Sequence, residues 1–236
     1  MLSLRIKAIT TSVGAAHKDT DMKTMKTFGN SNSFLLLLLV VLSTIAQAQI
    51  NSTPTAQQET ELAIQLAADR PIAAGQSYWL EELTWMEIRD LIADGATTII
   101  IPTGGIEENG PYLATGKHNL ILEATCPEIA EKLGNALCAP IVKFVPEGNI
   151  DPPSGSMLFP GTISLTQATY EALLLDISSS LKQSGFTDIV LIGDSGGNQS
   201  GMANVAAKLT ESWNSESARI HFVREFYDPG WEATEQ

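Results

Sequence analysis

The stretch TTIIIP, residues 97–102, is a β-branched apolar run that is too short for a helix. Its apolar side chains occupy successive positions rather than alternate ones, which predicts a strand that is buried on both faces. A helix pattern precedes the run, because Thr84 and Glu87 have the spacing of a capping box and Gly95 follows the last apolar position. A helix that leads into a fully buried strand is typical of an α/β protein.

The same alternation continues along the chain. Apolar periodicity and the glycines that follow it predict further helices over 119–133, 166–184 and 201–213, and further strands over 137–145, 188–192 and 219–223. Strands that alternate with helices of this length imply right-handed βαβ units, and hence a parallel sheet covered on both faces. In such sheets the loops that leave the carboxyl ends of the strands converge on one edge, where ligands bind.

Residues 1–48 have the pattern of a leader that contains a secretory signal peptide. Basic residues follow Met22, an apolar run covers 34–42, and AQA at 46–48 is a small-x-small cleavage pattern. The apolar run is about half of the roughly 20 residues that a membrane-spanning helix needs. We therefore expect an exported protein, periplasmic or secreted, with no membrane segment after cleavage. An uncleaved membrane anchor is the alternative.

The rest of the chain divides into a polar stretch over 49–76, interpreted as a linker or N-terminal arm with one short helix over 59–68, and one α/β domain over 77–236. Cleavage after Ala48 removes five of the 14 basic and two of the 27 acidic residues, which leaves a net charge of −16. This charge argues against a nucleic-acid partner. Only His118 and His221 remain after cleavage, which excludes a histidine-rich site.

Two cysteines, Cys126 and Cys138, lie twelve positions apart across the connection from a helix to a strand. An exported protein folds where disulfides form, so a bridge between the two is one interpretation. Two buried free thiols are the other, because unpaired cysteines are also commonly buried. No Cys-x-x-Cys pair or Cys/His cluster in the sequence indicates a zinc site.

The loop over 103–118, TGGIEENGPYLATGKH, follows the first buried strand. It carries Glu107, Glu108, Asn109 and His118, and carboxylate, amide and imidazole groups together suit a divalent cation. The alternative is a solvated acidic turn with a histidine that caps the next helix. The position of the loop at a strand end favours a functional role.

A loop of seventeen residues over 146–162, PEGNIDPPSGSMLFPGT, has no visible secondary structure. Loops of that length are usually functional or disordered. Its prolines and glycines restrict the backbone, and the apolar run 157–159 would be costly to expose, so we expect a folded lid or a subunit contact. We interpret its acidic residues Glu147 and Asp151 as solvated groups.

The loop over 193–198, GDSGGN, joins a strand to a helix and allows two interpretations. Its glycines and the free amides at the helix start can receive an anion, with Asp194 as a metal ligand or base. Alternatively, GDSGG fits the Gly-x-Ser-x-Gly pattern of a serine hydrolase, with Ser195 as nucleophile. The downstream base would then be His221, which lies inside a predicted strand.

Read in order, PTGGIEENGPYLATGKHN, FPGTISL and IVLIGDSGGN resemble three motifs of the creatininase (creatinine amidohydrolase) family, over about residues 79–227. The family shows a Glu-x-His-Gly-Pro-His stretch that ends in Thr-Asp, a Phe-Pro-Gly-Thr turn, and an Asn-Gly-His segment that runs into Gly-Gly-Asn. The resemblance implies a three-layer α/β/α sandwich around a mostly parallel sheet and frequent assembly into hexamers. It also implies a two-metal site that hydrolyses cyclic amides or related C–N bonds.

The metal ligands depart from the family pattern. Glu107 stands at the family's first metal glutamate, but Asn109 replaces its histidine, His118 its bridging aspartate, Ser195 the histidine of the last motif, and Gly197 a further acidic ligand. Relatives also continue past the last strand into a loop with more ligands, so we expect the α/β domain to lack the family's C-terminal segment.

From these residues we expect a metal-dependent hydrolase that acts on C–N bonds of a small molecule with an altered ligand set. Glu107, His118 and Asp194 are predicted to hold at most one divalent metal, Zn, Mn or Fe, and Asn109 or Asn198 to orient a carbonyl beside Glu107. The alternatives are a non-catalytic binding or scaffold protein with the same fold and, second, a serine hydrolase.

Overall fold

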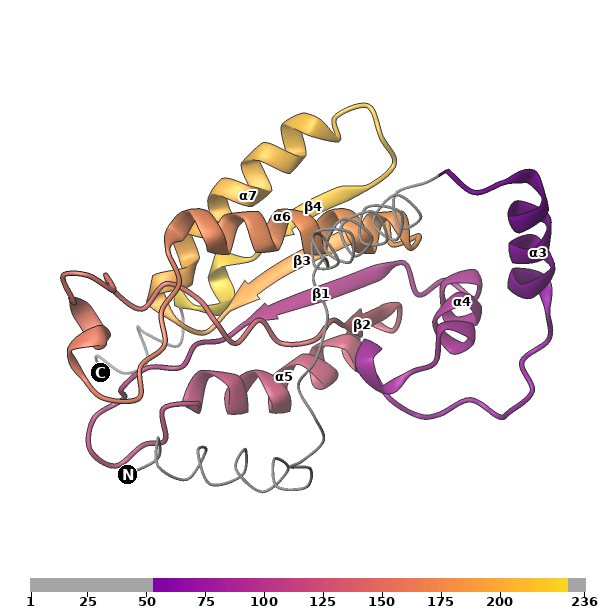
Figure 1. Ribbon diagram of the computed structural model, residues 1–236. Coiled ribbons are helices and arrows are strands. Elements are labelled where there is room, and N and C mark those ends of the chain that lie inside the picture. Colours follow the sequence, from indigo (N-terminus) through magenta and orange to yellow (C-terminus); the bar gives the residue numbers. More distant parts are fainter. Residues whose placement is uncertain (1–52, 229–236) are drawn as a thin grey trace, which may run out of the picture. The chain divides into compact units, whose positions relative to one another are not determined.

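The computed structural model describes residues 53–228, and the predicted leader lies outside them (Figure 1). The first described helix, α3 (Ala56–Ala67), corresponds to the short helix expected in the polar stretch and buries none of its residues. Among the described residues, no helix is both long enough and apolar enough to cross a bilayer. The chain from Leu66 onward is a separate structural unit, and it holds the sheet and all the predicted site residues.

Four parallel strands form the sheet, in the order β2-β1-β3-β4. Their bounds are β1 Thr98–Thr103, β2 Ala136–Cys138, β3 Asp188–Gly193 and β4 Arg219–Phe222. Thr98 pairs with Ala136 on one side and with Asp188 on the other, so the strands start in line and their carboxyl ends face one edge. Every residue of β1 is buried, as its run of isoleucines predicts.

The strand predicted over 137–145 is wrong in its length, because β2 ends at Cys138. Pro140 follows shortly after, and a proline has no N–H to donate to a ladder. Beyond it the chain still runs beside β1, but through a single bridge between Val142 and Thr103. The segment after β2 therefore continues to the carboxyl edge of the sheet without being a regular strand.

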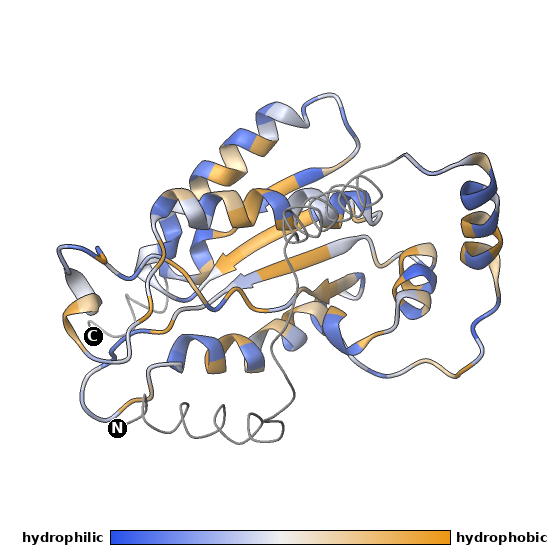
Figure 2. Cartoon of the chain, viewed as in Figure 1, coloured by the Kyte–Doolittle hydropathy of each residue, from blue (hydrophilic) through white to orange (hydrophobic). Residues whose placement is uncertain are grey.

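Helices on both faces make the protein a three-layer α/β/α sandwich, as expected, with α6 and α7 on one face of the sheet and α5 on the other (Figure 1). Their bounds are α4 Trp85–Ala93, α5 Lys117–Leu133, α6 Gln167–Gln183 and α7 Gln199–Ser212. Ile99 and Ile101 join the buried side chains of α6 and α7 in one core cluster, while Ile100 joins those of α5 in another. Figure 2 shows the apolar strands between helices of mixed polarity.

Helix α4 begins where the sequence predicts, whereas the start of α5 differs from the prediction. α4 starts at the predicted capping box, in which Thr84 Oγ1 accepts the Glu87 N–H and the Glu87 carboxylate accepts the Thr84 N–H. α5 begins at Lys117, two residues before the predicted start. Because of this shift, His118 lies in the first turn of α5 rather than in the preceding loop.

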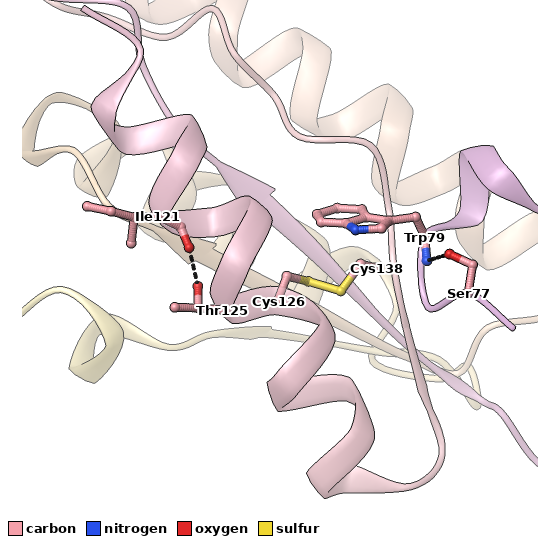
Figure 3. Close-up of a disulfide and its surroundings, with 6 residues drawn as sticks. All are labelled: Ser77, Trp79, Ile121, Thr125, Cys126 and Cys138. Atoms are coloured by element: carbon pink, nitrogen blue, oxygen red, sulfur yellow. Dashed lines mark hydrogen bonds between the residues drawn. A yellow bond between two sulfur atoms is a disulfide. The ribbon is translucent and has the colours of Figure 1, made fainter. Parts of the chain in front are cut away.

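A disulfide joins Cys126 of α5 to Cys138 of β2, with the two Cα atoms 6.2 Å apart (Figure 3). Both cysteines are fully buried. The bridge decides between the two interpretations left open by the sequence. It ties the helix that carries His118 directly to the edge strand of the sheet.

Candidate active site

The three predicted loops meet at the carboxyl edge of the sheet. Ile106, in the loop after β1, forms an antiparallel bridge with Ile163, and the Glu108 N–H donates to Thr162 Oγ1 at 3.3 Å. The loop over 146–162 is folded, as predicted, and contains the short helix η2 (Gly155–Leu158). Its apolar tip nevertheless stays exposed, since Leu158 and Phe159 are 65% and 51% exposed.

Glu107, His118 and Asp194 come together at this edge, in a row with the imidazole in the middle. His118 Nδ1 lies 2.7 Å from Asp194 Oδ2, and its Nε2 lies 2.8 Å from Glu107 Oε1. The second oxygen of Glu107 accepts the hydroxyl of Ser156, on η2, at 2.6 Å. Ionised carboxylates can only accept hydrogen bonds, so both ring nitrogens donate and His118 is an imidazolium.

The charged ring of His118 is buried, with a side chain that is only 6% exposed. Burial disfavours the charged form, but the hydrogen bonds to Asp194 and Glu107 outweigh it and raise the pKa of His118 to about 9. The neighbouring Lys117 ammonium acts in the opposite direction and does not reverse the result. At neutral pH the row therefore consists of one cation between two anions.

Glu147 is the site residue that sequence reasoning missed. Its interpretation as a solvated group is wrong, because it is 6% exposed. Its carboxyl lies so close to Gly105 that a Cβ at that position would overlap Glu147 Oε1, and its Oε2 accepts the Ser195 hydroxyl at 3.1 Å. The available signal was position, since Glu147 lies two residues after the predicted strand over 137–145 and so lies at the same edge as the other loops.

Glu107 and Glu147 form a pair of carboxyl groups with opposite pKa shifts. Burial, and then the charge of the nearby Glu107 carboxylate, raise the pKa of Glu147 well above its usual range. Burial would also raise the pKa of Glu107, but hydrogen bonds with His118 and Ser156 lower it below the usual range. Of the two carboxyl groups, Glu147 is therefore the one that holds a proton more readily.

The two predicted carbonyl-orienting amides have different surroundings. Asn198 is fully buried, and its Nδ2 donates to the backbone oxygens of Thr103 and Gly104 at 2.9 and 3.1 Å. Its amide holds the loop after β3 against the end of β1, and its catalytic role stays a prediction. Asn109 is partly exposed and donates to the backbone oxygen of Glu107 at 3.0 Å. Its catalytic role stays a prediction.

The arrangement needed for a serine hydrolase is not formed. Ser195 is 1% exposed, and its hydroxyl is bonded to Glu147. His221, the predicted base, contacts Asp188 at the start of β3, whereas Ser195 follows the end of that strand. The remaining histidine of the described chain, His118, has both ring nitrogens bonded to carboxylates. Within residues 53–228, no imidazole is thus free to take a proton from Ser195.

The predicted metal ligands do not fit a single ion as they are placed. Within residues 53–228 no three or more His, Cys, Asp or Glu side chains are grouped so that they could hold a metal. Glu107 and Asp194 lie at opposite nitrogens of the His118 ring, which point away from each other, and a ring nitrogen that carries a hydrogen has no lone pair for a metal. The assignment of these three residues as ligands of Zn, Mn or Fe therefore stays a prediction that this geometry does not support.

Comparisons with known proteins show which proteins this chain is similar to. A family model described as creatininase, creatinine amidohydrolase, matches residues 81–236. The creatinine amidohydrolase of Pseudomonas putida is 31% identical over 117 residues, which cover 50% of this chain and 44% of that protein. The mycofactocin precursor peptide peptidase of Mycolicibacterium smegmatis is 28% identical over 116 residues, 47% of this chain and 44% of that protein. The chain thus spans less than half the length of these curated relatives.

Solved structures of creatininase share the fold. A manganese creatininase is similar with a TM-score of 0.55 at 25% identity, over 63% of this chain and 58% of that chain. A mutant creatininase of the Zn-Zn type gives a TM-score of 0.52, also at 25% identity and with the same coverage. Divalent metals are therefore present in structures of similar proteins.

Proposed function

The chain belongs to the creatininase family, and we propose that it is a hydrolase that cleaves the amide C–N bond of a small molecule. Two of its relatives are a creatinine amidohydrolase and a peptide peptidase, and amide C–N cleavage is the chemistry that these two names share. The observation that carries the proposal is the carboxyl pair of Glu107 and Glu147, which lies at the edge of the sheet where ligands of parallel α/β proteins bind.

Glu147 is the proton donor of the proposed reaction. Amide hydrolysis adds the OH of a water to the carbonyl carbon and a proton to the leaving nitrogen. Glu147 can give that proton to the nitrogen because its raised pKa keeps it protonated at neutral pH. The attacking water then returns a proton to the Glu147 carboxylate, so that the residue ends the cycle as it began.

Burial and the negative charge of Glu107 keep the proton on Glu147, because they disfavour a second negative charge beside Glu107. The hydrogen bond that Glu147 Oε2 accepts from the Ser195 hydroxyl acts in the opposite direction and does not reverse the result. Glu107 is itself kept ionised by His118 and Ser156. His118 and Ser156 are positioning residues in this scheme, because they act on the reaction through Glu107.

A substrate panel tests the proposal. Purified protein is incubated with creatinine, other small cyclic amides and short peptides, and the products are identified by mass spectrometry. We expect one class to be cleaved and the Glu147→Gln variant to lose at least about 100-fold in rate, as for a removed general acid. Glu108→Gln is the matched control, since the Glu108 carboxylate accepts the turn N–H of Gly110 rather than a bond from Glu107 or Glu147, and the variant should keep the wild-type rate.

Two results would overturn the proposal. One is a wild-type rate in Glu147→Gln. The other is the absence of any turnover across the panel together with a rise in melting temperature on adding one of these compounds, which would identify a non-catalytic binding protein instead.

We also propose that the protein is exported. Because disulfides form in oxidising compartments, the bridge between Cys126 and Cys138 supports the secretory signal expected in residues 1–48. Expression of the full chain in a bacterium should yield a periplasmic or secreted form whose mass corresponds to a start at Gln49. An uncut chain in the cytoplasm would contradict it.

A further inference from the structure

The ring of His118 lies between two carboxylates, in the place that a metal ion would otherwise take. We propose that the imidazolium of His118 is the fixed positive charge of the site, and that Glu107, His118 and Asp194 bind no catalytic divalent metal. The inference deepens the proposed function, on which it rests for its catalytic meaning. Its geometric basis is independent of any turnover.

The first observation is the row itself. Each nitrogen of the His118 ring lies within 2.8 Å of a carboxylate oxygen, and the second oxygen of Glu107 accepts the Ser156 hydroxyl. Glu107 thus accepts hydrogen bonds at both oxygens and needs no proton of its own. The hydrogens of both contacts with His118 must then belong to the ring, which makes the ring a cation.

The second observation is the cost of replacing this cation with a metal. To bind an ion through Nε2 or Nδ1, His118 would lose a hydrogen from that nitrogen, and the carboxylate bonded there would lose its partner. The other carboxylate would remain on the far side of the ring, out of reach of the same ion. At most two of the three predicted ligands can therefore share an ion without a rearrangement of the loops.

The third observation concerns the positions beside the row. Asn109 carries an amide that donates to the backbone oxygen of Glu107 at 3.0 Å, and Ser195 carries a hydroxyl that donates to Glu147 at 3.1 Å. Neither group is a usual ligand of Zn, which prefers thiolate, imidazole and carboxylate. Both are instead used in bonds within the protein.

Burial and charge agree with this assignment. The His118 side chain is 6% exposed, so its charge is tolerated only because carboxylates lie on both sides. A second cation in the same place would meet this charge at short range.

Metal content and metal response test the inference without reference to turnover. The full chain is expressed in medium that contains Zn, Mn and Fe, purified without chelators and analysed by inductively coupled plasma mass spectrometry. We expect far less than one ion per chain, and a melting temperature that shifts by less than about 1 °C with excess ZnCl₂, MnCl₂ or EDTA, because only a ligand bound to the folded state raises it.

Variants make the result specific. His118→Asp removes the imidazolium and leaves a third carboxylate between Glu107 and Asp194, so we expect it to gain a melting-temperature rise of several degrees with Mn²⁺. His221→Gln is the control and should respond like the wild type. About one ion per wild-type chain, lost in His118→Gln but kept in His221→Gln, would overturn the inference. Lack of amide cleavage would contradict the proposed function. It would not change the conclusion drawn from metal content and melting temperature.

Discussion

Two histidines contact carboxylates at opposite ends of the same sheet, and only one of these contacts belongs to a candidate site. His118 at the carboxyl edge contacts two carboxylates at 2.7 and 2.8 Å, and His221 on β4 contacts Asp188 at 2.9 Å. The distances are alike, but the His118 side chain is 6% exposed and that of His221 is 45% exposed. Water screens an exposed pair, whereas the loss of one member of a buried pair leaves an unpaired charge. The burial of the histidine, rather than its distance from the carboxylate, therefore distinguishes the contact at the carboxyl edge from the contact at the amino edge.

The largest difference should appear in activity when a carboxylate is neutralised at each edge. Glu107→Gln removes the charge that keeps the proton on Glu147, so we expect the rate of amide cleavage to fall by about 100-fold or more. Asp188→Asn, the matched change at the amino edge, should leave the rate unchanged. Equal rates for the two variants would break the comparison.

Stability should separate the two histidines next. His118→Gln leaves Glu107 and Asp194 without a cation, and we expect the free energy of unfolding to fall by about 3–5 kcal/mol, the cost of breaking a buried pair. His221→Gln should cost less than about 1 kcal/mol, as for an exposed pair. Urea unfolding at pH 7 measures both values. A loss below 1 kcal/mol for His118→Gln would show that its charge is not needed.

The pH dependence of stability should sharpen the same contrast. The folded-state pKa of His118 is raised from 6.5 to about 9, so its contribution is complete below pH 6.5 and disappears as the pH rises through 9. This shift corresponds to about 3 kcal/mol of unfolding free energy. Urea midpoints measured from pH 6 to pH 10 should fall in the wild type and in His221→Gln, and fall much less in His118→Gln. Parallel curves for all three proteins would contradict the assignment.

The smallest expected effect is that of the contact between Ser156 and Glu107. Ser156→Ala removes the hydroxyl that donates to Glu107 Oε2, one of several bonds that keep Glu107 ionised, so the rate should fall by about 3- to 10-fold, the equivalent of one hydrogen bond. Ser179→Ala on α6 is the control, because the Ser179 hydroxyl donates only to the Leu175 backbone oxygen. A loss as large as that of Glu107→Gln would mean that Ser156 has a direct role in the reaction.

Local patterns were sufficient for the fold. The β-branched run of β1 and the apolar periodicity of the helices that follow reflect burial along one element, which neighbouring residues in the sequence decide. The length of β2 was mispredicted, because its apolar residues continue to Val145 while Pro140 interrupts the ladder. The family and the α/β/α sandwich were both predicted and are confirmed by the family match and the structural relatives.

The sequence predicts which residues of the site lie close together, but not how their side chains are arranged. Since the loops after β1 and β3 leave the same edge, the closeness of Glu107, His118 and Asp194 follows from topology. Whether they surround an ion or form a row depends on how the loops place Glu107 and Asp194 around the His118 ring, which no sequence pattern encodes. The burial of Glu147 was missed for a similar reason, because it results from a close approach to Gly105, which lies far away along the chain.

Nitrogen NMR of the His118 ring tests the central claim most directly. In the full chain labelled with ¹⁵N-histidine, and with signals assigned through His118→Gln and His221→Gln, both ring nitrogens of His118 should be protonated from pH 6 to pH 8 and should lose a proton near pH 9. Addition of Zn²⁺ should leave these signals in place. A ring with one bare nitrogen at pH 7, or signals that move when zinc is added, would contradict the account.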